Sequence, residues 1–305
     1  LGRTHSHRRV RASVMSQAER TGVAAVAVSV AIGVAISWAG SQGGTTLGAL
    51  PVFALCGLLS FGINWLVFVA AYVFQTERYF DLTGSVTYLS IVGVALVSGT
   101  PDVRALILGA MVAVWAVRLG GFLFARIRRD GGDGRFDALK PSLPRFLMTW
   151  TLQALWVLLT LSSALAAMTT ARPDPLGAFA GFGVLIWVLG FSTEVVADRQ
   201  KGRFRADPAN RDQFIQSGLW AWSRHPNYFG EIVLWCGVAV VAFPVLTGWQ
   251  YVTLVSPLFV YILLTRVSGI PLLEARGQQR WGNRTEYRAY TERTPILFPR
   301  PPRSA

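Results

Sequence analysis

The sequence is poor in charged residues, histidine and cysteine. Only 15% of its 305 residues are charged while 52% are hydrophobic, a balance too apolar for an ordinary water-soluble domain. Cys56 and Cys236 both lie in apolar runs, and no CxxC pair or cysteine–histidine cluster occurs, which argues against a disulfide framework and a structural zinc site. The only histidines are His5, His7 and His225, and we predict no bound metal.

Nucleotide-binding loop motifs are also missing. No predicted strand is followed by a Gly-x-Gly-x-x-Gly turn, which excludes a Rossmann domain. The glycine-rich segment 128–137 lacks the Gly-Lys-Ser/Thr ending of a phosphate loop. A dinucleotide bound to this chain would therefore lie among helices.

Long uncharged apolar runs dominate what the sequence does contain. A helix needs about 20 apolar residues to cross a hydrocarbon layer about 30 Å thick. Eight runs approach this length, the third being the shortest, and they lie near residues 22–39, 50–73, 84–98, 103–124, 145–168, 176–197, 228–246 and 249–268. The sequence therefore predicts an all-α fold, a polytopic integral membrane bundle of about seven or eight transmembrane helices.

The basic residues predict the orientation of this bundle. The net charge is +13, and the cations gather before the first run and in segments 125–145, 198–226 and 269–300. The alternate connections hold only Arg172, with Arg104 just inside the fourth run. This positive-inside pattern places both termini in the cytoplasm and predicts a multi-pass protein of the bacterial inner (plasma) membrane. Because the cations form no single stripe with interleaved aromatic residues, we expect no nucleic-acid partner.

A single domain accounts for most of the chain. Residues 1–20 are a basic leader that we expect to be disordered, residues 21–298 a single transmembrane domain, and residues 299–305 a tail rich in proline and arginine. Met15 is an alternative start, and a cleaved signal peptide is the competing interpretation of residues 1–40. We favour a first span that is retained, because removing one of eight spans would put the two termini on opposite sides of the membrane.

Ionisable residues at the end of the sixth run form a first candidate site. Such residues cost about 2.5 to 3.5 kcal/mol each at the centre of a membrane helix, so they are functional candidates by default. Glu194 and Asp198 are four residues apart and share a helix face, and Lys201 and Arg205 follow them. The carboxylates can accept from ribose hydroxyls or an amide, and the cations can hold phosphates. The alternative is a set of ordinary structural ion pairs.

Residues 223–231 form a second candidate site. Pro226 fits the first position of a helix, whose free N–H groups attract anions together with the charge of Arg224. His225 precedes this helix and either packs at its entry or joins the site.

The same helix carries a polar face into the next apolar run. Asn227 and Glu231 share that face, and Gly230 permits close approach of a ligand or a neighbouring helix. The alternative role of Glu231 is an internal ion pair with Arg118 or Arg266. Arg118 itself either extends to the interface or faces the bundle interior.

Candidates for proton transfer lie in and beside the second and third runs. Glu77 is at the cytoplasmic edge of the second run and Tyr88 is within the third, where a tyrosine is more commonly a core or interfacial residue. Asn64, Gln75 and Asp81 are weaker candidates, and a water molecule is a further one.

These motifs resemble the DUF1295 family of unknown function, a steroid 5-alpha-reductase C-terminal-like family related to steroid and sterol reductases and, distantly, to isoprenylcysteine carboxyl methyltransferases. The matching segments are 115–120, 126, 135–137, 194–201, 218–231, 268–274 and 286–294. The Ser-Arg-His-Pro-Asn-Tyr-x-Gly-Glu string is specific to the superfamily. The string from Glu194 to Lys201 favours the reductase-like branch.

The resemblance implies a membrane-embedded NADPH-dependent oxidoreductase that reduces a C=C bond of a lipophilic steroid-, isoprenoid- or enone-like substrate. Glu77 and Tyr88 are the catalytic candidates. The residues expected at the cofactor are Arg118, Arg126, Glu194, Asp198, Lys201, Arg205, Arg224, His225, Asn227, Tyr228, Glu231, Tyr287 and Tyr290. Vertebrate-type steroid reductases have adjacent Gln-Glu in the second span where this chain has Gln75-Thr-Glu77, so their substrate site is not transferable.

Two alternatives stay open. An S-adenosylmethionine-dependent methyltransferase of the isoprenylcysteine carboxyl type would use the same His-Pro-Asn helix entry, although its expected Glu-Glu pair is replaced here by Glu274-Ala275. A non-catalytic lipid-binding membrane protein would keep the fold and bind no nucleotide. The expected partners are the lipid bilayer and, for an enzyme, a lipophilic small molecule.

Overall fold

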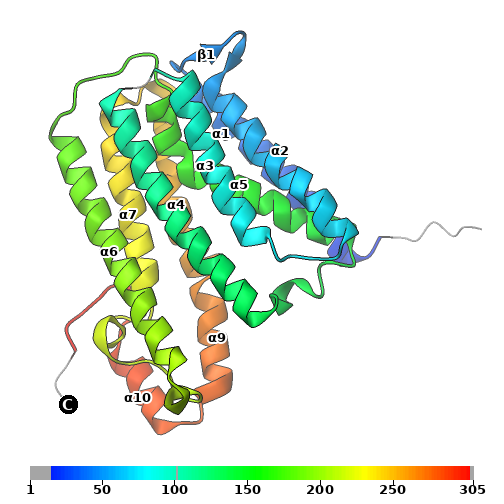
Figure 1. The fold of residues 1–305 in the computed structure, drawn as a ribbon, viewed down its shortest axis with the longest axis vertical. Coiled ribbons are helices and arrows are strands. Elements are labelled where there is room, and N and C mark those ends of the chain that lie inside the picture. Colours follow the sequence, from blue (N-terminus) through cyan, green and yellow to red (C-terminus); the bar gives the residue numbers. More distant parts are fainter. Residues whose placement is uncertain (1–14, 101, 303–305) are drawn as a thin grey trace, which may run out of the picture.

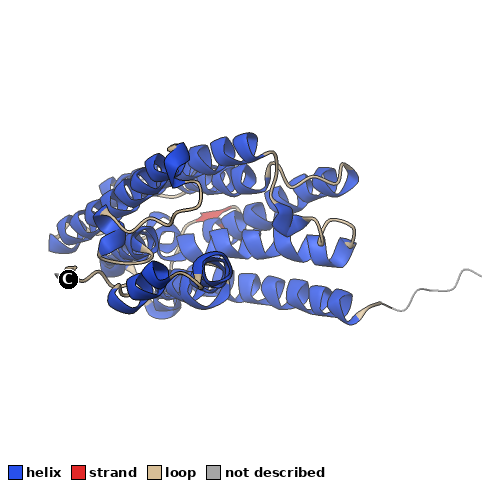
Figure 2. Ribbon diagram, turned by 90° about the horizontal axis from the view of Figure 1, so that it is seen from below, coloured by secondary structure: helices blue, strands red, loops and turns tan. Residues whose placement is uncertain are grey.

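The structure is a bundle of long helices with one short pair of strands (Figures 1 and 2). It is a computed structural model that describes residues 15–100 and 102–302. Most of the predicted leader lies outside the described residues. Its last part is ordered, because α1 begins at Gln17 with a capping box between Ser16 and Glu19.

Eight helices in the described part of the chain are long and apolar enough to cross a membrane, which confirms the predicted bundle. The first seven are built on α1 (Gln17–Gly40), α2 (Val52–Val73), α3 (Phe80–Ser98), α4 (Val103–Asp130), α5 (Leu143–Met168), α6 (Ala178–Ala206) and α7 (Pro226–Ala242). The eighth, Gly248–Trp281, joins a 3-10 turn, α8 (Val255–Ile262), a π-helical turn and α9 (Ile270–Trp281). A short helix, α10 (Thr285–Arg293), follows.

The fifth helix is the centre of the bundle. The most apolar window of α5 is 89% buried, whereas those of α1 and α6 are each 28% buried. α5 packs against α1, α2, α3, α4, α7 and α8. The outer helices therefore present apolar side chains to the lipid, as expected for a membrane bundle.

The two strands and a buried arginine lie at the end of the bundle opposite α10. β1 (Thr46–Leu47) and β2 (Leu50–Pro51) pair in an antiparallel hairpin between α1 and α2. Arg104 is 1% exposed, and its guanidinium donates to the backbone oxygens of Val241 (2.9 Å), Pro175 (3.0 Å) and Asp174 (3.3 Å). It therefore binds the carbonyl end of α7, where the helix dipole favours a cation.

Glycines bring α6 and α7 into close contact along most of their length. A Cβ atom on Gly230 would lie 2.6 Å from the backbone oxygen of Gly190, and one on Gly237 would lie 2.6 Å from that of Gly183. Small residues of this kind let the backbones of membrane helices approach closely. Gly230 thus serves a neighbouring helix, one of the two roles predicted for it.

The C-terminal segment closes the α10 end of the bundle. The N–H of Arg224 donates to the Pro295 oxygen (2.9 Å), and the N–H of Arg300 donates to the Trp222 oxygen (3.0 Å). The hydroxyl of Ser223 donates to the Leu297 oxygen (2.8 Å). The predicted tail at 299–305 is therefore anchored at Arg300, and its last three residues lie outside the described part of the chain.

Candidate functional site

An ion cluster joins α4, α6 and α7 inside the bundle. The guanidinium of Arg118 donates to both Glu194 and Asp198, and the side-chain amide of Asn227 donates to Asp198 (3.2 Å). The predicted common face of Glu194 and Asp198 is confirmed by their shared partner. Arg118 faces the bundle interior, which was one of its two predicted placements. The side chains of Arg118, Glu194 and Asp198 are only 19%, 3% and 11% exposed.

A third carboxyl group, that of Glu231, lies near this cluster. Glu231 is 8% exposed and interacts electrostatically with Glu194, Asp198 and Arg118. Within residues 15–100 and 102–302, Glu231 forms no ion pair with Arg118 or Arg266, which was the alternative role predicted for it. One carboxyl oxygen of Glu194 is buried without a hydrogen-bond partner. The cluster thus gathers three carboxyl groups around the one guanidinium of Arg118.

The entry of α7 is held by a carboxylate from α9. α7 begins at Pro226, as predicted. Glu274 pairs with the guanidinium of Arg224 and contacts Nε2 of His225 at 2.8 Å. The ring of His225 stacks on that of Tyr228, with centroids 5.6 Å apart. Burial lowers the pKa of His225, and the hydrogen bond with Glu274 opposes this only in part, so the imidazole is neutral at neutral pH.

A first cavity of about 270 Å³ opens beside this helix entry. Five cations line it, namely Lys201, Arg205, Arg224, Arg276 and Arg280. Its other lining side chains include Phe214, Trp220, His225, Glu274, Trp281, Tyr287 and Tyr290. Cations and aromatic rings in one hollow suit a ligand that carries both phosphate groups and flat rings.

A second cavity, of about 470 Å³, adjoins the first and shares Arg205, Leu273 and Arg276 with it. Its further lining residues include Arg126, Gly132, Asp133, Gly134, Arg135, Tyr228 and Ser268. The volumes of both cavities lie near the range of small-molecule sites. Six of the thirteen residues expected at the cofactor line the first cavity and three line the second, Arg205 being common to both.

Two aromatic residues that were not among the predicted site residues, Phe214 and Trp220, help to shape the first cavity. Lys201 Nζ lies 4.4 Å from the ring centroid of Trp220, within the range of a cation–π contact. The hydroxyl of Tyr290 donates to the Trp220 backbone oxygen (2.8 Å), so this tyrosine also has a structural role. Phe214 packs between the rings of Tyr287 and Tyr290. Phe214 lies in none of the matching segments, whereas Trp220 lies in segment 218–231, which was the available signal for it.

Tyr88 lies deep in the bundle, away from the two polar cavities. Its side chain is 5% exposed and packs against Trp115 and Trp235, with ring centroids 5.1 and 6.3 Å away. Its hydroxyl makes no hydrogen bond of normal geometry with the described residues but interacts with the Thr160 side chain. Tyr88 lines a small internal cavity of about 40 Å³ together with Asp81 and Gln153.

The polar residues around this internal cavity form a hydrogen-bonded network. Gln153 Nε2 donates to Asn64 Oδ1 and to the Phe80 oxygen, each at 2.9 Å, and Asn64 Nδ2 donates to Thr87 Oγ1 at 3.3 Å. Asn64, a weaker catalytic candidate, is thus engaged in holding α2, α3 and α5 together. Satisfied networks of this kind fix the geometry of a core.

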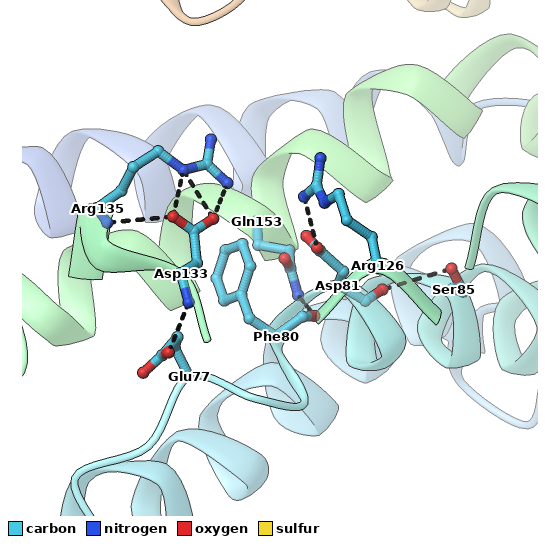
Figure 3. Close-up of polar contacts among 8 residues, drawn as sticks. All are labelled: Glu77, Phe80, Asp81, Ser85, Arg126, Asp133, Arg135 and Gln153. Atoms are coloured by element: carbon cyan, nitrogen blue, oxygen red, sulfur yellow. Dashed lines mark hydrogen bonds and ion pairs between the residues drawn. The ribbon is translucent and has the colours of Figure 1, made fainter. Parts of the chain in front are cut away.

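Glu77 anchors the loop between α4 and α5 (Figure 3). Its carboxylate accepts from the Asp133 N–H (3.0 Å) and from Lys140 Nζ (2.8 Å). Burial tends to raise the pKa of Glu77, but these donors outweigh it and lower the pKa below its usual value. Such a group is a carboxylate acceptor at neutral pH, which does not suit the proton-donor role predicted for it.

Protonation of Glu77 is expected to release this loop. A lowered folded-state pKa contributes stability above the unfolded value of about 4.5, and this contribution is lost as the pH falls through the folded value. Glu77→Gln should reproduce the loss at neutral pH, lowering stability by about 1 to 3 kcal/mol and accelerating tryptic cleavage after Arg135. Asp137→Asn, which alters a 71% exposed partner of Lys140, is the control. Equal cleavage rates for wild type and Glu77→Gln would show that the contact does not hold the loop.

The fold and the site define a multi-pass helical membrane protein with two adjoining basic cavities beside a buried ion cluster. The sequence profile described as "Protein of unknown function (DUF1295)" matches residues 67–294, so the chain belongs to that family, as predicted. Comparisons with curated proteins and with solved structures found no match.

Proposed function

We propose that the protein is an NADPH-dependent reductase that acts on a C=C bond of a lipophilic substrate in the bacterial inner membrane. The observation that carries the proposal is the pair of adjoining cavities, which together present seven cationic side chains and several aromatic rings next to the Arg118 cluster. The orientation with both termini in the cytoplasm, where NADPH is available, belongs to the same proposal.

The donor set of the cavities fits a phosphate-rich dinucleotide. Arginine is suited to phosphate, because its planar fork can donate two parallel hydrogen bonds. Arg224 lies at the entry of α7, where free backbone N–H groups add to its charge. Its Nε atom is buried without an acceptor among the described residues. S-adenosylmethionine carries no phosphate, and the surplus of cations therefore favours NADPH over it.

The remaining site residues would orient the reactants and exclude water. NADPH, when bound, supplies the hydride. Arg118 holds Asp198 and Glu194 in place. Because Glu77 is held as a carboxylate, Tyr88 is left as the proton-donor candidate of the two.

Equilibrium binding of NADPH, NADH and S-adenosylmethionine to the detergent-purified protein tests this proposal. We expect saturable NADPH binding that weakens about 10- to 100-fold in Arg224→Ala, the usual effect of losing a charged hydrogen bond. Arg172→Ala is the control, because this exposed arginine lies outside both cavities that hold the site. Thermal unfolding of each variant checks its folding. Preference for S-adenosylmethionine would indicate methyl transfer, and binding of none of the three would contradict an enzymatic role of this kind.

A further inference from the structure

The second cavity already contains one carboxylate, that of Asp133 (Figure 3). Arg135 Nε donates to both oxygens of Asp133, at 2.9 and 2.8 Å, and the Asp133 side chain is 15% exposed. Four arginines line this cavity, namely Arg126, Arg135, Arg205 and Arg276. One internal anion thus lies among several cations.

The position of Asp133 is set by the loop that carries it. Gly131 ends α4 with φ +83, a left-handed conformation that turns the chain sharply away from the helix. The N–H of Asp133 donates to Glu77, which also binds Lys140 at the other end of the loop. These contacts place the Asp133 carboxylate beside Arg135 in the structure.

Two of the other cations of this cavity, Arg126 and Arg276, are at most partly neutralised by carboxylates of the described residues. Arg126 reaches Asp81 at 3.6 Å, a long ion pair with both side chains partly exposed. Arg276 is exposed and has no ion pair within residues 15–100 and 102–302. The cavity therefore keeps a positive surplus after Asp133 is counted, and a second anion would be attracted to it.

Asp133 is itself ionised at neutral pH. Burial opposes its ionisation, but hydrogen bonds from Arg135, aided by the charge of Arg126, lower its pKa below the usual value. The same contacts raise the pKa of Arg135. The guanidinium of Arg135 is therefore paired with a fully ionised carboxylate, that of Asp133.

We propose that this cavity binds a phosphate group and that Asp133 is its internal competitor, which occupies Arg135 until a phosphate-bearing ligand displaces it. The identification of that ligand as NADPH rests on the proposed function, whereas the competition itself does not. The glycines at 131, 132 and 134 flank Asp133 and permit the backbone rotation that the exchange requires.

Asp133→Asn separates this role from a structural one. The Asp133 side chain also accepts from the Arg135 N–H (3.1 Å) as the cap of a 3-10 turn, and asparagine keeps that oxygen while removing the charge. We expect the affinity for inorganic pyrophosphate at low ionic strength to rise about two- to fivefold, the usual size of an exposed ion pair. Arg135→Gln should lower it, and both effects should shrink at high salt.

The control is Asp137→Asn, which neutralises a carboxylate of the same loop that does not line the cavity and should leave pyrophosphate binding unchanged. Equal or weaker pyrophosphate binding by Asp133→Asn would overturn the internal-competitor proposal, even if wild type binds NADPH. Tighter pyrophosphate binding by Asp133→Asn without NADPH binding by either protein would support the competitor and overturn the reductase proposal.

Discussion

Replacing Gly230 with alanine is expected to destabilise the protein by about 1 to 3 kcal/mol, the usual cost of forcing a methyl group into a well-packed core. The new Cβ would lie 2.6 Å from the Glu194 nitrogen and from the Gly190 oxygen, both backbone atoms of α6 that cannot rotate away. The two helices must therefore separate. Since Asn227 and Glu231 flank Gly230 on α7 and face Asp198 and Glu194 on α6, nucleotide binding should weaken together with stability.

The sign of this effect is what makes the experiment informative. In a helix without a close neighbour, exchange of glycine for alanine stabilises by about 0.4 to 1 kcal/mol. Gly181, also on α6, has no atom within 4 Å of its ideal Cβ position, so Gly181→Ala should be neutral or stabilising. Measuring the unfolding of both variants in the same detergent compares them directly. A stable Gly230→Ala variant would show that α6 and α7 are farther apart than described.

Removing the guanidinium of Arg118 is expected to destabilise the protein by about 3 to 5 kcal/mol, the cost of leaving a buried charge without its partner. Arg118→Ala would leave the side chains of Glu194 and Asp198, which are 3% and 11% exposed, without their shared cation. Arg118→Lys keeps the charge but loses the fork that reaches both carboxylates, so we expect an intermediate effect. Unfolding by sodium dodecyl sulfate measures these differences.

A neutral version of the cluster serves as the control. Arg118→Leu combined with Glu194→Gln and Asp198→Asn removes the cation together with the two carboxylates that it pairs with, so neither of them is left without its cation. This triple variant should be markedly more stable than Arg118→Ala, because interacting residues do not contribute additively. If the triple variant and Arg118→Ala lost the same stability, the effect would come from lost packing of the Arg118 side chain rather than from charge. If the proposed function holds, both variants should bind NADPH more weakly than wild type.

Hydrophobic runs predicted the helices well but not all of their ends. The sixth run was expected to end near residue 197, whereas α6 continues to Ala206. Hydropathy marks where a helix leaves the hydrocarbon, not where its hydrogen bonds end, and the polar residues 198–206 remain helical outside the apolar stretch. The eighth run likewise continues beyond residue 268 into α9, so that Glu274 and Arg276 lie on a helix rather than in a loop.

The site was predictable where its residues share one helix. Glu194 and Asp198 could be paired from their spacing, but the identity of their partner, Arg118, depends on how α4 packs against α6. The contact of Glu77 could not be predicted for the same reason, since its partner Lys140 lies 63 residues later in another loop. Glu274 showed only a motif match in the sequence, and its contacts with Arg224 and His225 emerge from the packing of α9.

The C-terminal strap at Pro295–Arg300 has a consequence for biosynthesis. Its hydrogen bonds to residues 222–224 hold the entry of α7, yet these residues are translated only after all eight membrane helices. During synthesis, Arg224 therefore emerges with an unpaired backbone N–H, and the basic cavity beside it stays incompletely formed. A nascent chain released before Pro295 would be inserted in the membrane without a finished site. Only chains translated through this segment would then have the complete cavity that the proposed ligand requires.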